Sequence, residues 1–267
     1  HFNVFLGMQI FDSFKSSLNQ SLDLFLGYKI VIKREDLIHP RVSGNKFRKL
    51  KYIFQEIKEK EMPALLTFGG AFSNHLAATA NAGKNNRVHT IGIVRGDEWK
   101  EKVHESTTLN YCVSQGMKLH CVSRDIYAQK EQAQIVMKLM NEIPRLRIIP
   151  EGGTEPLAVK GCLEILQSKD LDFDVICSSV GTGGTIAGLI NSSNDNQNII
   201  GFNALNNTEI VQTIEELTNK LCSRRYNIND VFMECMGDEK IILLNMIENI
   251  NVNLLKIYAY VDLFNNS

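Results

Sequence analysis

The chain alternates short apolar segments rich in β-forming residues with longer helical stretches, and this alternation restricts its possible folds more than any other feature. Several apolar segments are nearly continuous hydrophobic runs, which is typical of strands buried on both faces of a sheet. Strands that alternate with helices predict an α/β protein with mainly parallel sheets. The predicted strands are residues 29–34, 64–68, 88–94, 118–122, 147–150, 174–180 and 199–202. The predicted helices are residues 45–60, 74–85, 102–115, 128–141, 155–168, 185–191, 209–220 and 240–249.

The composition argues against two broad classes of partner. The 267 residues include 29 Lys and Arg against 30 Asp and Glu, so no net field attracts nucleic acid or an anionic membrane. Apolar runs such as 22–26 and 175–177 are far too short to span a bilayer. With 44% hydrophobic and 22% charged residues, the chain is typical of a soluble protein of one large or two modest domains.

The cysteines and the opening residues indicate the cellular compartment of the protein and whether it has a metal site. Because no Cys-x-x-Cys pair occurs and most cysteines lie within apolar runs, we expect reduced, buried thiols and a cytoplasmic protein. The opening segment has no basic region of the kind that begins a signal peptide. We expect no metal site, since Thr108 stands where a metalloprotease helix beginning at His104 needs its second histidine. The cysteines are Cys112, Cys121, Cys162, Cys177, Cys222 and Cys235.

A glycine-rich segment follows the predicted strand 174–180 and consists of Gly181, Thr182, Gly183, Gly184 and Thr185. A strand that enters such a turn and opens a helix directs several backbone N–H groups at one point, where the helix dipole adds positive potential. No Gly-Lys-Ser/Thr follows, which excludes a P-loop, and Ile186 stands where the dinucleotide fingerprint needs its third glycine. The segment therefore indicates a phosphate monoester more than a dinucleotide, with a ligand-free turn as the alternative.

A second turn, Gly69-Gly70-Ala71-Phe72-Ser73-Asn74-His75, again joins an apolar strand to a predicted helix. Ser73 or Asn74 is a natural N-cap, and that role alone accounts for either residue. The two glycines ahead of the cap also make an anion pocket suited to a small carboxylate. His75, in the first helical turn, fits either that pocket or an ordinary surface position.

Lys46 lies near the start of the predicted helix 45–60. At about 100° per residue, Lys46 falls within roughly 45° of the centre of the helix's apolar stripe, whereas Arg48, Lys49 and Lys51 fall about 95° or more away. We therefore expect Lys46 alone among these basic residues to point where water is scarce. Burial and the positive end of the helix dipole both lower the pKa of an amine and favour a neutral nucleophile. The stripe consists of Phe47, Leu50, Ile53, Phe54 and Ile57.

Together, these three features match the needs of a pyridoxal-phosphate enzyme that acts on an amino acid. Lys46 would carry the cofactor, the turn at 181–185 would hold its phosphate, and the turn at Ser73 would hold the carboxylate of the substrate.

Five segments, in this order and approximate spacing, resemble a known group of fold-type-II pyridoxal-phosphate enzymes. The sequence is similar to the 1-aminocyclopropane-1-carboxylate deaminase and D-cysteine desulfhydrase family, which is tryptophan synthase beta-like, over about residues 15–205. The segments are Lys33-Arg34-Glu35-Asp36-Leu37, Ser43-Gly44-Asn45-Lys46-Phe47-Arg48-Lys49-Leu50, Thr67-Phe68-Gly69-Gly70-Ala71-Phe72-Ser73-Asn74-His75, Pro150-Glu151-Gly152-Gly153 and Gly181-Thr182-Gly183-Gly184-Thr185.

The resemblance implies two three-layer α/β domains and a homodimer. We expect residues 49–151 to form a small domain, and residues 1–48 with 152–267 to form the large domain that binds pyridoxal 5'-phosphate. By position, Lys46 would hold the cofactor and then transfer the proton of the substrate, Asn74 would bond the ring hydroxyl, and 181–185 would bind the phosphate. The resemblance assigns substrate binding to Ser73, Asn74 and His75, with Ser73 also catalytic.

The implied reaction is the loss of a β-substituent from a small amino acid. D-cysteine would give pyruvate, ammonia and sulfide, and 1-aminocyclopropane-1-carboxylate would be opened and deaminated through the same electron sink. Two side chains bear on the choice: His75 matches the desulfhydrase-like members, whereas Phe72 stands where relatives often have Gln or Tyr. Cysteine synthesis, threonine dehydration and a nucleotide-dependent Rossmann enzyme stay open.

The C-terminal third departs from the family pattern. Members carry there a substrate-facing tyrosine and a group bonded to the pyridine nitrogen, on glycine-containing loops, and no such pattern follows Gly201. We therefore expect a divergent or truncated C-terminal part, with Tyr258 and Tyr260 in core packing. The alternative function is accordingly a catalytically impaired homologue that binds pyridoxal phosphate or another phosphorylated ligand.

Overall fold

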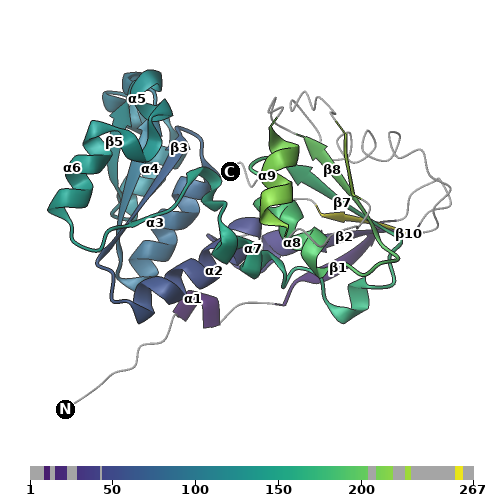
Figure 1. Ribbon diagram of the computed structural model, residues 1–267. Helices are drawn as coiled ribbons and strands as arrows, with labels where there is room; N and C mark the ends of the chain where they lie inside the picture. The colour runs from purple at the N-terminus through teal and green to yellow at the C-terminus, as the bar shows by residue number, and fades with distance from the viewer. Residues whose placement is uncertain are drawn as a thin grey trace, which may run out of the picture. The chain divides into compact units, whose positions relative to one another are not determined.

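The computed structural model describes residues 9–12, 16–22, 29–42, 44–203, 209–218, 226–229 and 256–260 (Figure 1). Its strands are β1 Leu18–Leu22, β2 Lys29–Arg34, β3 Ala64–Gly70, β4 His89–Arg95, β5 Lys118–Val122, β6 Arg147–Ile148, β7 Val175–Val180, β8 Asn198–Asn203, β9 Tyr226–Asn229 and β10 Lys256–Tyr260. Its α-helices are α1 Gln9–Asp12, α2 Gly44–Glu59, α3 Asn74–Asn86, α4 Thr107–Ser114, α5 Arg124–Ala128, α6 Gln134–Glu142, α7 Pro156–Cys162, α8 Gly184–Ser192 and α9 Ile210–Leu217. Its 3-10 helices are η1 Glu35–Leu37, η2 Asp97–Lys100, η3 Val103–Glu105, η4 Lys130–Gln132, η5 Glu151–Gly153 and η6 Ser168–Asp170.

The chain divides into two compact units. The first comprises the described residues within His1–Phe14 and His39–Ala158, and the second those within Lys15–Ile38 and Val159–Ser267. The predicted small domain, 49–151, lies inside the first unit, which also takes in its flanking residues on both sides. The predicted domain boundaries themselves stay a prediction.

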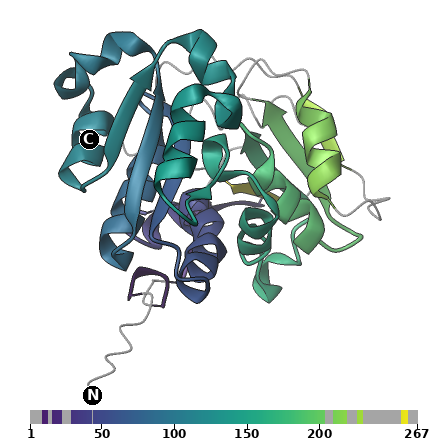
Figure 2. The same ribbon diagram turned by 60° about the vertical axis from the view of Figure 1, so that its left-hand side comes forward.

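The first unit is built on a parallel four-stranded sheet with the strand order β5-β4-β3-β6 (Figure 2). One face packs against α5 and α6 through a cluster of buried residues that includes Phe68 and Tyr127. The other face packs against α3 and α4, where Val94 meets Leu76 and Leu109. Each face of the sheet is therefore covered by helices, as the nearly continuous apolar strands predict.

The apolar stripe predicted for the helix after residue 44 is confirmed. All five of its members are buried in α2. Phe11 of α1 packs its ring against two of them, with centroids 5.1 Å from that of Phe47 and 5.8 Å from that of Phe54. The stripe therefore anchors α2, and with it Lys46, within the first unit.

The second unit is built on a six-stranded sheet with the order β1-β2-β10-β7-β8-β9. Only β1 runs antiparallel to its neighbour, and the other pairs are parallel. A cluster of buried residues joins Ile176 of β7 to Leu189 of α8 and Ile214 of α9. Strand β10 carries Tyr258 and Tyr260, but their side chains lie outside the described part, so their predicted core packing stays a prediction.

The strand order of each sheet reverses at one place, and this place positions the candidate site. In the first unit β4 and β5 extend to one side of β3, while β6 pairs on its other side. In the second unit β8 and β9 extend to one side of β7, while β10 pairs on its other side. Parallel α/β sheets bind ligands beyond the carboxyl ends of the strands at such a reversal. Both predicted binding turns, 69–75 after β3 and 181–185 after β7, leave the sheets at these places.

The predicted α/β class with mainly parallel sheets is confirmed, and several predicted helices are shorter. The helix predicted over 102–115 begins only at Thr107, because Ser106 caps α4 by accepting a hydrogen bond from Leu109 N at 3.1 Å. The helix predicted over 128–141 is divided between α5 and α6 by Lys130, whose φ is +50°, and by extended Ala133. The helix predicted over 155–168 ends at Cys162, and the one over 240–249 lies outside the described residues.

Two further findings concern the described ranges as a whole. No helix within them is long and apolar enough to cross a membrane. No group of three or more His, Cys, Asp and Glu side chains in the same ranges is arranged to hold a metal ion.

Candidate active site

The turn after β3 carries Ser73, Asn74 and His75. Ser73 is the N-cap of α3, and its Oγ accepts a hydrogen bond from Leu76 N at 3.3 Å, which confirms the capping role predicted for this turn. Asn74 is exposed at the first position of the helix, whereas His75 is buried. The N–H groups and the dipole at the start of this 13-residue helix make the turn suited to a small anion.

The imidazole of His75 is enclosed within the first unit, with 2% of the residue exposed. Its Nε2 lies 2.8 Å from Thr67 Oγ1, which also lies 3.2 Å from the carbonyl oxygen of Ile149. Because a carbonyl oxygen only accepts, we assign the Thr67 hydroxyl as the donor to Ile149 and His75 Nε2 as the donor to Thr67. Nδ1 is then the acceptor nitrogen of the ring, and it has no hydrogen-bond partner among the described residues.

Electrostatics place Lys46 near this histidine. Burial holds the pKa of His75 well below its usual value of 6.5, and the charges of Lys46 and then Lys49 lower it further. A charge acts in this way only over a short distance. Burial, together with the charges of two lysines of α2, therefore keeps the imidazole of His75 neutral.

The expectation that Lys46 alone among the basic residues of α2 lies where water is scarce is wrong. Lys46 is half-buried, whereas Arg48 is 2% exposed and Lys49 is 1% exposed. The helix is enclosed on more than its apolar stripe, so positions far from the stripe are also buried. A single-stripe analysis cannot detect a second, polar contact surface.

Lys49 ties α2 to the turn that follows β6. Its Nζ donates hydrogen bonds to the carbonyl oxygen of Gly152 at 3.1 Å and to Thr154 Oγ1 at 2.9 Å. Lys49 also lies three residues beyond Lys46 on the same helix, and residues at that spacing are neighbours on a helix surface. The two lysines therefore occupy neighbouring positions on one side of α2.

Gly153 completes the surroundings of His75. Its φ is +67°, and a Cβ at this position would lie 2.8 Å from Cε1 of the His75 ring. Backbone conformation and close approach therefore both require glycine. The turn after β6 and the first turn of α3 meet through this contact, at the reversal of the strand order.

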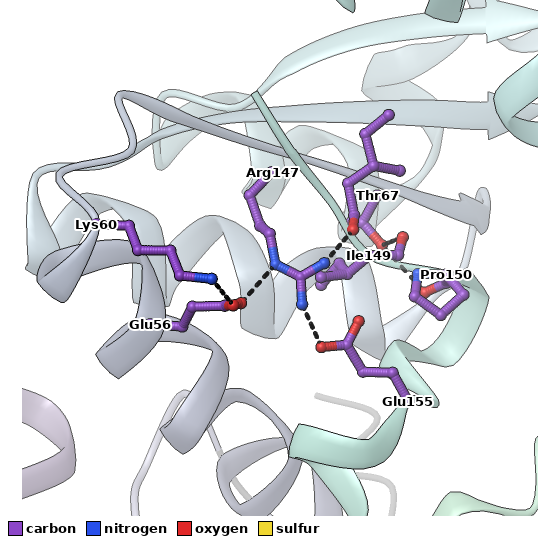
Figure 3. A network of polar contacts seen from close by, with 8 residues as sticks. Glu56, Lys60, Thr67, Arg147, Ile149, Pro150 and Glu155 are labelled. Carbon is purple, nitrogen blue, oxygen red and sulfur yellow. Dashed lines mark hydrogen bonds and ion pairs between the residues drawn. The ribbon is translucent and has the colours of Figure 1, made fainter. Parts of the chain in front are cut away.

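Arg147 of β6 holds the same turn from the other side (Figure 3). Its Nε donates to Glu56 Oε2 at 2.9 Å, and its Nη2 donates to Glu155. Glu56 also pairs with Lys60 at 2.6 Å. The network links β6, α2 and the segment before α7, so the residues between Arg147 and Glu155 are fixed at both ends.

The glycine-rich segment of the second unit has the predicted arrangement of strand, turn and helix. Gly183 is the N-cap of α8 with a φ of +82°, and a Cβ there would lie 3.0 Å from Ile214 Cγ1 of α9. The positive φ and the close approach of α9 therefore both favour glycine at this position. The start of the nine-residue α8 contributes N–H groups without intrahelical acceptors. Thr182 is half-buried and Thr185 is buried beside it. This local geometry suits a phosphate group.

The Lys33-Arg34-Glu35-Asp36 segment has a structural role within the second unit. Lys33 Nζ donates to Asp170 Oδ2 at 2.7 Å, and both side chains are fully buried. Burial lowers the pKa of Lys33, and the hydrogen bond to Asp170 opposes that shift. Arg34 pairs with Asp36 at 2.7 Å. The pair of Lys33 and Asp170 connects β2 to η6, which precedes β7, whereas the pair of Arg34 and Asp36 connects β2 to η1.

Sequence reasoning missed Thr67, Lys49 and Thr154 as parts of the site. Thr67 and Lys49 lie within two of the five segments that resemble the family, but neither segment shows what its side chains contact. Their partners are far away in the sequence: Ile149 lies 82 residues after Thr67, and Gly152 and Thr154 lie 103 and 105 residues after Lys49. The pairing of β3 with β6 brings these segments close.

Comparison with known proteins supports a single family. The family model described as "Pyridoxal-phosphate dependent enzyme" matches residues 17–231. A Thermotoga maritima protein provisionally named 1-aminocyclopropane-1-carboxylate deaminase is 30% identical over 224 residues, which cover 79% of this chain and 70% of that protein. The bifunctional D-cysteine desulfhydrase/1-aminocyclopropane-1-carboxylate deaminase of Arabidopsis thaliana is 30% identical over 178 residues, or 61% of this chain and 44% of that protein.

A solved structure extends the similarity in fold. The crystal structure of an ACC deaminase homologue superposes with a TM-score of 0.73 at 20% identity, and the match covers 97% of this chain and 94% of that one. The fold-type-II architecture predicted from the sequence is thereby confirmed, and it reaches beyond residue 205. The chain spans about half the length of several curated relatives that it matches, with 51% and 44% covered in two of them.

Proposed function

Because the chain belongs to the pyridoxal-phosphate dependent enzyme family, we propose that it is a lyase or deaminase that acts on a small amino acid. We propose D-cysteine, converted with water to pyruvate, ammonia and hydrogen sulfide, or 1-aminocyclopropane-1-carboxylate as its substrate. Relatives about 30% identical carry the names of both activities.

The observation that carries this proposal lies within the first unit. Lys46 of α2 is close enough to perturb His75, and His75 belongs to the turn capped by Ser73. A lysine amine and a helix N-terminus that suits a carboxylate thus occur in one unit, at the reversal of its strand order. An amino-acid substrate needs both groups.

Taken separately, the residues of each unit suit one part of pyridoxal 5'-phosphate. The half-buried Lys46, with a buried cation on the next turn of its helix, supplies an amine of the kind that bonds the cofactor's aldehyde. The turn from Gly181 to Thr185, bare of side chain at Gly183, supplies backbone donors for the phosphate. We propose that Asn74, exposed at the start of α3, bonds the ring hydroxyl. When bound, the cofactor supplies an electron sink for the bonds at the substrate's Cα.

The remaining steps belong to side chains of this protein. Ser73 and the backbone N–H groups after it bind and orient the substrate's carboxylate. With D-cysteine as the substrate, Lys46, once its amine is free, moves the proton at Cα; 1-aminocyclopropane-1-carboxylate has no such proton. The neutral His75 holds the start of α3 against Gly153 and bonds Thr67, so it sets the position of Ser73 and Asn74.

The second candidate is a homologue of impaired catalysis. It would bind the cofactor, or another phosphorylated ligand, and convert little substrate. The observation that favours it is the sequence after Gly201, which lacks the glycine-containing pattern expected for a substrate-facing tyrosine and a group at the ring nitrogen. We further propose that the protein is cytoplasmic and forms a homodimer. Sedimentation would test the dimeric state.

The test is a product assay on the protein incubated with pyridoxal phosphate. Pyruvate, ammonia and sulfide are measured from D-cysteine and compared with the products from L-cysteine, L-serine, L-threonine and 1-aminocyclopropane-1-carboxylate. Turnover of D-cysteine or the cyclopropane substrate supports the proposal. Turnover of L-threonine or L-serine alone would replace it with a dehydratase, and bound cofactor without any product would select the second candidate.

A further inference from the structure

Phe72 is the most exposed large hydrophobic residue of the described part of the chain, at 69%. It lies in the turn between β3 and α3. Its ring meets Trp99 edge to face, with centroids 5.4 Å apart and the planes at 87°. An exposed aromatic side chain held in one place by a second aromatic ring is a typical feature of a binding surface.

Trp99 is held in place by the fold. It lies in η2, beyond the carboxyl end of β4, and packs partly buried against the cluster that contains Ala71 and Leu76. Glu98 beside it pairs with Arg124 at 2.7 Å, and Trp99 N donates to Gly96 O at 3.3 Å. The indole therefore forms a fixed surface against which Phe72 rests.

The aromatic pair borders the turn proposed to bind the substrate's carboxylate. Phe72 immediately precedes Ser73, so its Cα lies about 3.8 Å from that of the capping residue. Both rings lie beyond the carboxyl ends of neighbouring strands, where ligands of parallel sheets bind. An amino acid whose carboxylate lies at Ser73 therefore brings its side chain within reach of these rings.

Arg95, at the end of β4, lies close to the same turn, with its Nη2 3.7 Å from where a Cβ at Gly70 would be. The guanidinium of Arg95 stacks on Tyr127, 5.8 Å from the ring centroid, and Tyr127 belongs to the cluster on the α5 and α6 face. Trp99 instead packs with the cluster on the α3 and α4 face. The two rings of Phe72 and Trp99 therefore present apolar surface on the α3 and α4 side of the sheet.

We propose that Phe72 and Trp99 form the wall that receives the substrate's side chain, and that the substrate is a neutral amino acid with an apolar or sulfur-containing side chain. This inference rests on the proposed function, because the turn at Ser73 defines where the carboxylate lies. Apolar side chains bind the pair by removing both surfaces from water, whereas hydroxyl and carboxylate side chains lose hydration against the faces of the two rings.

Trp99 is the single tryptophan of the chain, so its fluorescence reports on this surface directly. The protein, with and without prior incubation with pyridoxal phosphate, is titrated with both enantiomers of 2-aminobutyrate, serine and aspartate. The first two are nearly equal in size, and 2-aminobutyrate has no β-substituent to lose. We expect 2-aminobutyrate to shift the emission and to saturate at about tenfold lower concentration than serine.

Two variants make the test specific. Phe72→Ala should reduce the preference for 2-aminobutyrate over serine to about twofold or less, and Phe72→Tyr should retain the ring and most of the preference. Met137→Ala removes another exposed apolar side chain, on α6, and should leave the preference unchanged.

The outcomes separate this inference from the proposed function. Failure of the cofactor to bind Lys46 would overturn the proposed function, whereas the titration still measures the preference of the aromatic pair. Three results would overturn the inference. They are equal affinities for 2-aminobutyrate and serine, no change of emission with any amino acid, and an equal loss of affinity for both ligands in Phe72→Ala.

Discussion

The ammonium group of Lys49 lies 3.1 Å from the carbonyl oxygen of Gly152. A buried cation on α2 thereby holds the turn after β6, and Gly153 in that turn packs against the ring of His75. The conformation of the candidate site in the first unit thus depends on a contact between residues 103 positions apart.

Replacing Lys49 by Met tests this contact. The variant keeps the length of the side chain but leaves Gly152 O and Thr154 Oγ1 without their donor. We expect the free energy of unfolding, measured in urea, to fall by about 1–3 kcal/mol. Lys58→Met, at an exposed position of the same helix, should change it by less than about 0.5 kcal/mol. Equal effects of the two substitutions would contradict the assigned role of Lys49.

Gly153→Ala should destabilise the protein more than Gly116→Ala. Both glycines have positive φ, at +67° and +89°, so each alanine incurs backbone strain of about 1–2 kcal/mol. A Cβ at Gly116 meets nothing within 4 Å, whereas one at Gly153 lies 2.8 Å from the buried His75 ring. Unfolding midpoints of the two variants compare the effects, and equal losses would show that the contact with His75 is unimportant.

The pH dependence of stability should carry the signature of His75. Its pKa in the folded protein lies well below 6.5, so the unfolded chain binds more protons between those two values. Stability contributed by the neutral ring is therefore fully present above about pH 6.5 and declines as the pH falls, by up to about 1.4 kcal/mol per pH unit. In His75→Gln, the free energy of unfolding should depend less steeply on pH between about pH 5 and 7, because the contribution of His75 is missing. His39 and His120, whose pKa values burial also lowers, remain in both proteins, so the same slope in both would refute the assignment to His75.

Asp170→Asn should be more damaging than its small chemical change suggests. The substitution leaves the buried charge of Lys33 without its counter-ion, and such a loss typically costs about 3–5 kcal/mol. Adding Lys33→Met removes that charge, so the double variant should be more stable than Asp170→Asn alone. Strict additivity in the urea-unfolding cycle would mean that the two residues are not coupled.

Local sequence patterns predicted the strands of the first sheet, and β2, β7 and β8 of the second. The predicted bounds of β2 and β5 match the structure, because each is a short apolar run with clear ends. The capping serine of α3 and the glycine-rich start of α8 were also predictable, since both depend on neighbouring residues. The turns that follow β3 and β7 could be identified as candidate binding turns for the same reason.

Elements that depend on distant partners were not predictable. Strand β1, Leu-Asn-Gln-Ser-Leu, has little apolar periodicity and exists as an edge strand paired with β2. Strand β10 lies between β2 and β7, whose residues come far earlier in the sequence. The burial of Lys49 likewise follows from the position of the turn after β6, which no pattern within α2 reveals. Sequence spacing specifies the faces of a helix but not what packs against them.

The central claim is that Lys46 carries pyridoxal phosphate. The most direct measurement is the visible absorption spectrum of the protein incubated with the cofactor, followed by borohydride reduction and peptide mass spectrometry, with Lys46→Ala as the control. We predict an absorption band of lysine-bound cofactor and a reduced label confined to Lys46, both lost in the variant. No band, or a label distributed over surface lysines equally in both proteins, would contradict the account.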